Sequence, residues 1–236
     1  MNNFELVENL NFKDKIERSL SIIDKAYKEF GEFLVVAHSL GKDSIVVWDL
    51  VKKINPNIKG FIVTTRFKPF ETKEFMKKTI KKYPELKVYQ NDEQQIEDGL
   101  YKVDPDKCCY LLKVIPTRNA LLDLNAKCWI TGLRCTEGHT RNDFKEEEYR
   151  EENLKKVNPI LLWTEREVWQ YLALNKIDIN PLYNEGFRSL GCEPCTKISN
   201  KAERSGRWIE TSKCGGECGI HTQKLIEKKI DDSGGL

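Results

Sequence analysis

The sequence has 236 residues, enough for one large α/β domain or two small ones. Its 39 basic and 37 acidic residues nearly cancel to a net charge of +2, which argues against a general nucleic-acid or membrane-surface binder. No apolar run reaches the ~18–20 residues that span a bilayer. Because the N-terminus carries early acids and no apolar signal core, we expect a cytoplasmic protein.

Strand and helix patterns alternate over the first half of the chain. Apolar residues at helical spacing predict a helix within residues 4–30, ending at Gly31. Short β-rich apolar runs predict buried strands, with helical segments between them. In chain order these elements are strand 32–39, helix 42–54, strand 58–65, helix 70–83, strand 86–90, helix 108–124 and strand 126–133. This alternation predicts an α/β fold with a doubly wound, mostly parallel sheet.

The pattern loosens after about residue 134. We interpret the charge run at 145–153 as a solvated connection. Residues 164–177 predict a helix, with Thr164 as N-cap and Glu167 three residues on. From residue 186 onward Gly, Pro, Cys and Arg dominate, so we expect loops with short helical turns.

The loop between the first predicted strand and its helix has the composition of an anion site. It consists of Ser39, Leu40, Gly41, Lys42, Asp43 and Ser44. Backbone N–H groups of such a turn and of the helix N-terminus converge on an anion, and Lys42 adds a positive charge. The spacing differs from the G-x-x-x-x-G-K-[ST] phosphate loop. The alternative interpretation is an ordinary strand-to-helix turn.

Four of the eight cysteines form two closely spaced pairs. Cys108 and Cys109 are adjacent, and 82 residues separate Cys109 from the C-x-x-C pair Cys192 and Cys195. Clustered cysteines in a reducing compartment indicate metal or redox chemistry. Adjacent ligands strain a tetrahedral zinc site, whereas the corners of a [4Fe–4S] cube lie further apart. We therefore predict a [4Fe–4S] cluster, with zinc or buried structural thiols as alternatives.

Several motifs together resemble those of the assimilatory sulfonucleotide (APS/PAPS) reductases of the adenine nucleotide α-hydrolase superfamily. The loop at 39–44 is similar to that superfamily's S-G-G-K-D-S loop, with Leu40 in place of a glycine. The segment after Cys109 matches C-C-x-x-x-K-x-x-P through Lys113. Three further matches are TGLRCTEGHTR (131–141), ERSGRW (203–208) and ECGIH (217–221).

The resemblance implies a Rossmann-like enzyme of the [4Fe–4S] adenylyl-sulfate (APS) reductase type. Cys218 would attack the sulfate sulfur, release AMP and carry an S-sulfonate until thioredoxin or a glutaredoxin-like donor releases sulfite. The implied metal ligands are Cys108, Cys109, Cys192 and Cys195. The implied substrate-binding residues are loop 39–44, Lys113, Arg134, Arg141, Arg204, Arg207 and His221. We accordingly divide one compact unit into an N-terminal helical segment (1–30), a nucleotide-binding α/β domain (31–185) and a CxxC loop with the catalytic tail (186–236).

Two other functions stay open. The first is an ATP pyrophosphatase acting in sulfate activation or in sulfur transfer to nucleic acid, favoured by Lys42 and by residues 163–183, which resemble the small subunit of ATP sulfurylase. The second is a non-catalytic nucleotide-binding subunit with an iron–sulfur or zinc site. Departures at Cys135, Glu137 and residues 138–139 leave APS, its 3′-phosphorylated form and ATP open as substrates. The role of Cys214 and homo-oligomer formation are open as well.

Overall fold

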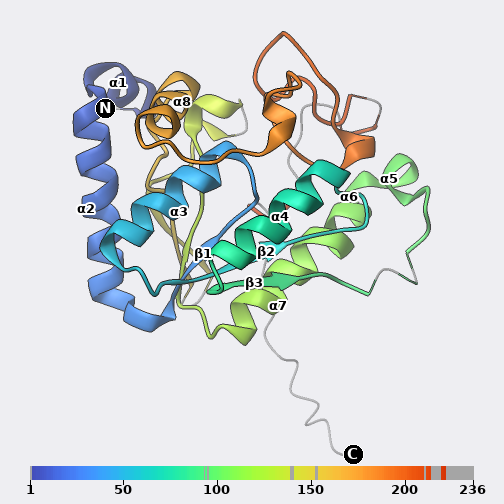
Figure 1. Cartoon of the computed structure of the whole chain (residues 1–236), viewed down its shortest axis with the longest axis horizontal. Helices are drawn as coiled ribbons and strands as arrows, with labels where there is room; N and C mark the ends of the chain where they lie inside the picture. The colour runs from blue at the N-terminus through green and yellow to red at the C-terminus, as the bar shows by residue number, and fades with distance from the viewer. Residues whose placement is uncertain are drawn as a thin grey trace, which may run out of the picture.

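A computed structural model describes residues 2–92, 94, 96–138, 141–151, 154–209, 211–213 and 219–221. Six strands form one sheet in the order β3-β2-β1-β4-β6-β5, with helices on both faces (Figure 1). Five strands run parallel, namely β1 (Leu34–Ala37), β2 (Lys59–Val63), β3 (Leu86–Tyr89), β4 (Cys128–Ile130) and β6 (Leu154–Val157). The edge strand β5 (Glu147–Glu151) pairs antiparallel with β6. The predicted doubly wound, mostly parallel sheet is confirmed.

The helices divide between the two faces of the sheet. One core packs alternate strand residues, among them Val36 and Ile130, against α2 (Phe12–Phe30), α3 (Lys42–Ile54), α4 (Phe70–Lys82) and α8 (Glu165–Leu174). A second core packs the opposite strand residues, among them Val35 and Trp129, against α7 (Ile115–Asp123). Successive side chains of a strand point to opposite faces, so both layers are needed to bury the sheet.

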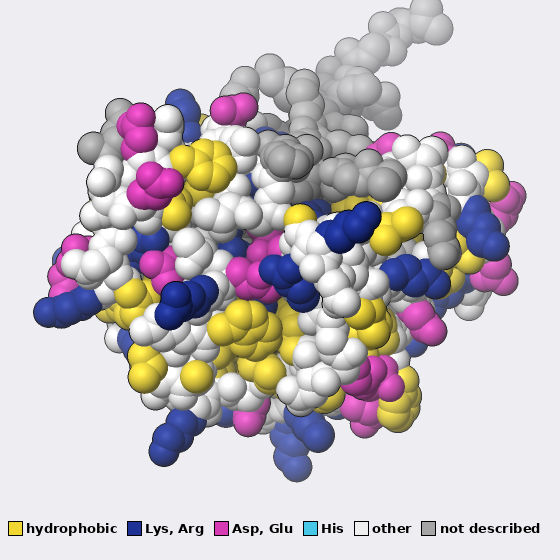
Figure 2. Space-filling model, turned by 90° about the horizontal axis from the view of Figure 1, so that it is seen from above, with side chains coloured by type: hydrophobic (Ala, Val, Ile, Leu, Met, Phe, Trp, Pro, Cys, Tyr) yellow, Lys and Arg dark blue, Asp and Glu magenta, His cyan; other side chains and the backbone are white. Residues whose placement is uncertain are grey.

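Short helices complete the chain. These are α1 (Asn3–Asn9), α5 (Leu100–Val103) and α6 (Pro105–Cys109). A π-helical turn, η2 (Tyr110–Val114), joins α6 to α7. No helix within the described ranges is long and apolar enough to cross a membrane. The face seen in Figure 2 intersperses basic with acidic side chains, in keeping with the small net charge.

Two sequence predictions need correction. The segment 145–153 is not merely a solvated connection, because it contains β5, whose Glu147 pairs with Lys25 and Lys155 at 2.9 Å each. Charged residues suit a sheet edge because they discourage pairing with another chain. The helix predicted within 4–30 is two helices, since the Asn11 side chain accepts the Asp14 N–H and starts α2 afresh.

The strand order fixes where a ligand would bind. The chain builds β1, β2 and β3 outward in one direction, then crosses to place β4 on the other side of β1. Open α/β sheets bind ligands at such a switch point, outside the carboxyl ends of the strands. The loops that follow β1 and β4 therefore frame the candidate site.

Candidate functional site

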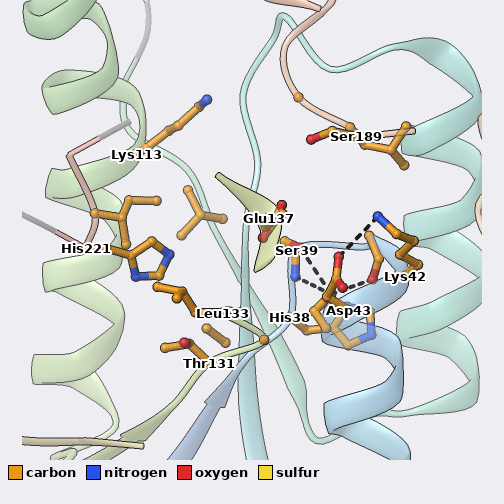
Figure 3. Close-up of a pocket in the computed structure, with 18 of the residues that line it drawn as sticks. His38, Ser39, Lys42, Asp43, Lys113, Thr131, Leu133, Glu137, Ser189 and His221 are labelled. Atoms are coloured by element: carbon orange, nitrogen blue, oxygen red, sulfur yellow. Dashed lines mark hydrogen bonds and ion pairs between the residues drawn. The ribbon is translucent and has the colours of Figure 1, made fainter. Parts of the chain in front are cut away.

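A cavity of about 200 Å³ lies at this switch point. Figure 3 shows Lys113 and His221 on one side of it and Lys42 and Asp43 on the other. Most residues predicted to bind substrate line the cavity, namely Ser39, Gly41, Lys42, Asp43, Ser44, Lys113, Arg141, Arg204, Arg207 and His221. The structure thus gathers residues from five separate motifs around one space.

The loop after β1 has a backbone shaped for glycine. Leu40 adopts a left-handed conformation with φ of 66°, which costs energy for any residue with a Cβ. Its side chain is buried in the core and is not part of the cavity lining. The Ser39 N–H donates to Ser44 Oγ at 3.1 Å, and Ser44 Oγ donates to the Gly41 carbonyl at 2.9 Å. The departure from glycine at this position therefore leaves the loop open to a ligand.

Lys42 and Arg134 form ion pairs with acidic side chains. Lys42 Nζ pairs with Glu203, lies 3.4 Å from Asp43 and donates to the Arg188 carbonyl at 2.9 Å. Arg134 donates to Asp43 and to Glu203, each at 2.5 Å, and is fully buried outside the cavity lining. These two cations hold the loop after β1 against the segment that contains Glu203.

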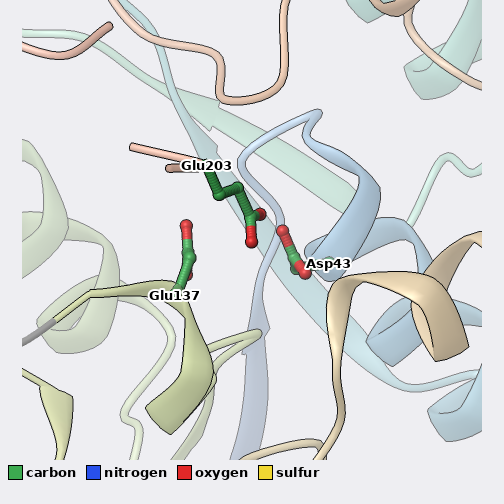
Figure 4. A group of neighbouring side chains, drawn as sticks. All are labelled: Asp43, Glu137 and Glu203. Carbon is green, nitrogen blue, oxygen red and sulfur yellow. The ribbon is translucent and has the colours of Figure 1, made fainter. Parts of the chain in front are cut away.

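Glu137 belongs to the same network. It pairs with Arg141 and lies 3.4 Å from Arg204. Burial raises the pKa of Glu137, but Arg141 and Arg204 outweigh it and hold the pKa well below its usual range. Carboxylate oxygens of Asp43, Glu137 and Glu203 lie within 4.8 Å of one another (Figure 4). Each is already paired with a basic side chain, so the group is a salt-bridge network.

The four cysteines of the C-C and C-x-x-C motifs surround a second cavity. Cys108 and Cys109 come from α6, and Cys192 and Cys195 come from the turn around η6 (Glu193–Cys195). All four are buried and form no disulfide. Burial and the neighbouring cysteines raise the pKa of Cys108 to about 12, with Lys113 acting in the opposite direction. The structure brings the predicted metal ligands together.

The spacing of the sulfurs distinguishes between metal groups. A tetrahedral zinc ion with Zn–S bonds of about 2.3 Å holds its sulfurs about 3.8 Å apart. Within the described ranges, the only three acid, histidine or cysteine ligand atoms gathered within 4.8 Å are those of Asp43, Glu137 and Glu203. No three of the four described cysteine sulfurs are therefore gathered as one zinc ion would hold them, and four cysteine thiolates are a donor set that iron–sulfur clusters take.

Lys113 connects the two cavities. It lies on the π-helical turn that follows the tandem cysteines, and it lines both cavities. Such turns occur frequently at functional sites. On the same side, the Arg207 guanidinium lies 4.3 Å from the ring centroid of Trp208, which packs against Cys192 and Cys195. Two basic side chains therefore lie between the cysteines and the first cavity.

The C-terminal tail reaches this site through its described residues 219–221. The His221 ring stacks on Trp129, with centroids 5.7 Å apart and planes inclined by 11°. Burial and the nearby Lys156 and Arg141 keep the pKa of His221 well below its usual value, so the ring is neutral. Cys214 and Cys218 lie outside the described residues.

Sequence reasoning missed several residues of the site, and two of them contact Lys42. Tyr183 lines the first cavity, and Glu203 is buried against Lys42 and Arg134. Tyr183 ends the segment that resembles ATP sulfurylase, and Glu203 directly precedes the ERSGRW arginine, Arg204. Both residues lie inside stretches that resemble known motifs, and this position was the available signal.

The fold and its two cavities define an α/β protein with a polar pocket at the switch point of its sheet and a buried cysteine site beside that pocket. Residues 33–198 match the family described as phosphoadenosine phosphosulfate reductase domain, and the chain belongs to that family. Adenosine 5′-phosphosulfate reductase 1 of Bacillus subtilis (strain 168) is 36% identical over 222 residues, covering 88% of this chain and 92% of that protein. The reductase of Lysinibacillus sphaericus (strain C3-41) is 34% identical, covering 90% and 95%.

Solved structures agree on the fold. A phosphoadenylyl-sulfate reductase from Candida auris superposes with a TM-score of 0.65 at 20% identity, covering 78% of this chain and 96% of that one. Candida glabrata FMN adenylyltransferase superposes with a TM-score of 0.61 at 18% identity, covering 87% and 75%. At these identities the likeness concerns architecture. The match of residues 33–198 to the family model confirms the family predicted from the motifs.

Proposed function

We propose that the protein reduces adenylyl sulfate to sulfite and AMP in a thiol-dependent reaction. The observation that carries this proposal is the position of Lys113, which lines both the nucleotide-type pocket and the cavity of four cysteines. An anionic group bound beside Lys113 lies next to the cysteine site. The curated relatives that match most of the chain are named adenosine 5′-phosphosulfate reductases.

Basic residues on the cysteine side of the pocket are suited to hold the phosphate and sulfate. On the cysteine side these are Lys113 and Arg207, both in the cavity wall. Arg141 and Arg204 also line the pocket, where they pair with Glu137. Arginine's planar fork suits phosphate and sulfate oxygens. Lys42 and Arg134 play a different part in this proposal, because their charges are paired with Asp43 and Glu203. They position the loop after β1 rather than bind the sulfate.

The chemistry needs one nucleophilic thiolate and one dithiol donor. The Cys218 thiolate attacks the sulfate sulfur, the S–O bond of the anhydride breaks, and AMP leaves with the electron pair. A thioredoxin- or glutaredoxin-type thiolate then attacks the Cys218 sulfur and expels sulfite. The donor's second thiol resolves the mixed disulfide, so the donor supplies both electrons. Such a reaction suits the cytoplasm, where thiols stay reduced.

Cys108, Cys109, Cys192 and Cys195 would hold a [4Fe–4S] cluster. When bound, the cluster would alter the electrostatic environment of the sulfate and transfer no electrons. Thiols ligate a metal as thiolates, so the bound cluster would place negatively charged ligands in this cavity. Lys113 and Arg207 lie where they compensate that negative charge.

The anaerobically purified protein should form sulfite from adenylyl sulfate when thioredoxin is supplied. Cys218→Ser should abolish this activity, and Cys214→Ser, in the same tail, reports whether the second thiol takes part. Sulfite that persists in Cys218→Ser contradicts the mechanism. Pyrophosphate from ATP without sulfite from adenylyl sulfate would instead indicate the ATP pyrophosphatase. That alternative relied on Lys42, whose Nζ is paired with Glu203 and Asp43.

A further inference from the structure

The hydroxyl of Tyr183 lies at the N-terminus of α3. Tyr183 ends the short turn η5 (Pro181–Tyr183), and its Oη accepts the backbone N–H of Lys42 at 2.8 Å. Lys42 is the first residue of α3, and the first N–H groups of a helix have no partner within it and attract anions. Tyr183 is also part of the cavity wall. Its hydroxyl therefore lies where an anion meets the helix.

Neighbouring residues fix the position of this hydroxyl. The fully buried Asn180 accepts the Leu182 N–H at 3.2 Å and donates to Thr72 Oγ1 at 3.1 Å, which anchors the turn before Tyr183. The Tyr183 ring packs edge-to-face on Trp169, with centroids 5.1 Å apart. Its orientation is thus determined before any ligand arrives.

Gly41 permits the close approach of the hydroxyl. A Cβ at residue 41 would lie 3.2 Å from Tyr183 Oη and 3.4 Å from Ser39 Oγ, which is tighter than ordinary contact for the first atom. The absence of a Cβ at residue 41 therefore leaves room for the Tyr183 hydroxyl as well as for a ligand.

The phenol has one proton to donate. Burial raises the pKa of Tyr183, and the nearby Asp43 raises it further, so the phenol stays protonated at neutral pH. Its oxygen already accepts the Lys42 N–H, which leaves the O–H as a donor. Among the described residues no acceptor for this proton is present. Tyr183 is part of the cavity wall, and a ligand oxygen at the helix terminus would supply an acceptor for its hydroxyl proton.

We propose that Tyr183 is a substrate-binding residue whose phenol O–H donates to a phosphate oxygen of the bound nucleotide. The Lys42 N–H and the Tyr183 O–H then form a relay in which the helix terminus polarises the phenol and the phenol contacts the anion. The inference relies on the proposed function only in taking an adenine nucleotide as the ligand. It adds a neutral donor on the loop side of the pocket, opposite the basic residues on the cysteine side.

Calorimetric titration of the holoprotein with AMP and with adenosine tests this role. Tyr183→Phe removes one oxygen and keeps the ring. We expect about a 10- to 100-fold weaker affinity for AMP, as for loss of a hydrogen bond to a charged group, and unchanged affinity for adenosine. The matched control is Tyr171→Phe, which also removes a buried hydroxyl, one that donates to Asp49 at 2.7 Å outside the cavity. That variant should bind both ligands like the unmodified protein.

Equal weakening of AMP and adenosine, or no change in either, overturns the inference. If Tyr183→Phe fails to fold, Gly41→Ala provides the second variant, because its Cβ would lie 3.2 Å from Tyr183 Oη and shift the hydroxyl, so it should weaken the affinity for AMP more than that for adenosine. Failure of the unmodified protein to bind AMP overturns this inference together with the proposed function. Selective loss of AMP affinity in a protein that forms no sulfite supports the inference and contradicts the proposed reductase.

Discussion

The two sides of the pocket are built differently. On the loop side, Lys42 and Arg134 are buried and paired with Asp43 and Glu203. On the cysteine side, four buried thiols surround a cavity, and the described residues contain no disulfide among them. The protein's own ion pairs fix the first side. Under the proposed function, a group bound among the cysteines would join two chain segments on the second side, because metal binding and folding are coupled at such sites.

The largest effect is expected from a substitution that removes one metal ligand on the cysteine side and leaves the loop side intact. Cys192→Ser should lose nearly all bound iron and sulfite formation, because it removes one of four ligands. Adenosine binding should persist, since the loop side does not depend on the metal. Iron content per chain and calorimetry measure the two effects. Cys128→Ala, a buried cysteine of β4 outside the cysteine cavity, should keep its iron. Equal iron in both variants contradicts the ligand assignment.

The next largest effect is expected from a substitution that removes an ion-pair partner on the loop side and so lowers the stability of the protein. Glu203→Leu leaves Lys42 and Arg134 buried without one of their acids, so it should lower the free energy of unfolding by about 3–5 kcal/mol. Urea unfolding of the iron-loaded protein measures this change. The control is Asp24→Asn, which breaks an exposed pair with Lys28 and should cost about 0–1 kcal/mol. A similar loss in both variants would show that the buried network does not stabilise this side.

A smaller change tests how closely the sheet approaches the loop. A Cβ at Gly132, just beyond β4, would lie 2.9 Å from the Asp43 carbonyl carbon and 2.9 Å from the Ser44 nitrogen. These are backbone atoms, so Gly132→Ala must push β4 and α3 apart. We expect a loss of about 1–3 kcal/mol in urea unfolding, as for overpacking. Gly99→Ala, which meets no atom within 4 Å, is the control, and equal stability of the two variants contradicts the contact.

The smallest expected effect is the pH dependence of the loop side. Burial lowers the pKa of His38 to about 4, below the value of about 6.5 in the unfolded chain. The unfolded state therefore binds more protons between these values, and stability falls as the pH falls. Between about pH 7 and pH 5.5 the loss from His38 should be about 1 kcal/mol. His38→Asn should show a smaller loss over this interval, and an unchanged slope contradicts the assignment.

Much of the fold followed from local patterns. The apolar runs at 32–39, 58–65 and 126–133 each contain a strand, because burial on both faces selects continuous apolar sequence. The edge pair β5–β6 was not predicted. Lys155 and Lys156 lie in β6 with their charges paired to glutamates, and such a strand has no apolar alternation to detect.

The four cysteines were singled out by their spacing, and Lys113 by the resemblance of its segment to a family motif. The four cysteines and Lys113 came together as expected. The pairing of Lys42 was not predictable, because its partner Glu203 lies 161 residues away in the chain. Tyr183 was missed for the same reason, since its contact with Lys42 spans 141 residues. Motifs identify reactive residue types, but long-range packing decides which charges are already paired.

The shared position of Lys113 has a thermodynamic consequence. Within the described ranges it is the one side chain common to both cavity walls. Under the proposed function, a group bound among the cysteines and an anion bound in the pocket would therefore both interact with the Lys113 ammonium. Linkage is reciprocal, so whatever factor cluster loading imposes on nucleotide affinity, the nucleotide must impose equally on cluster retention.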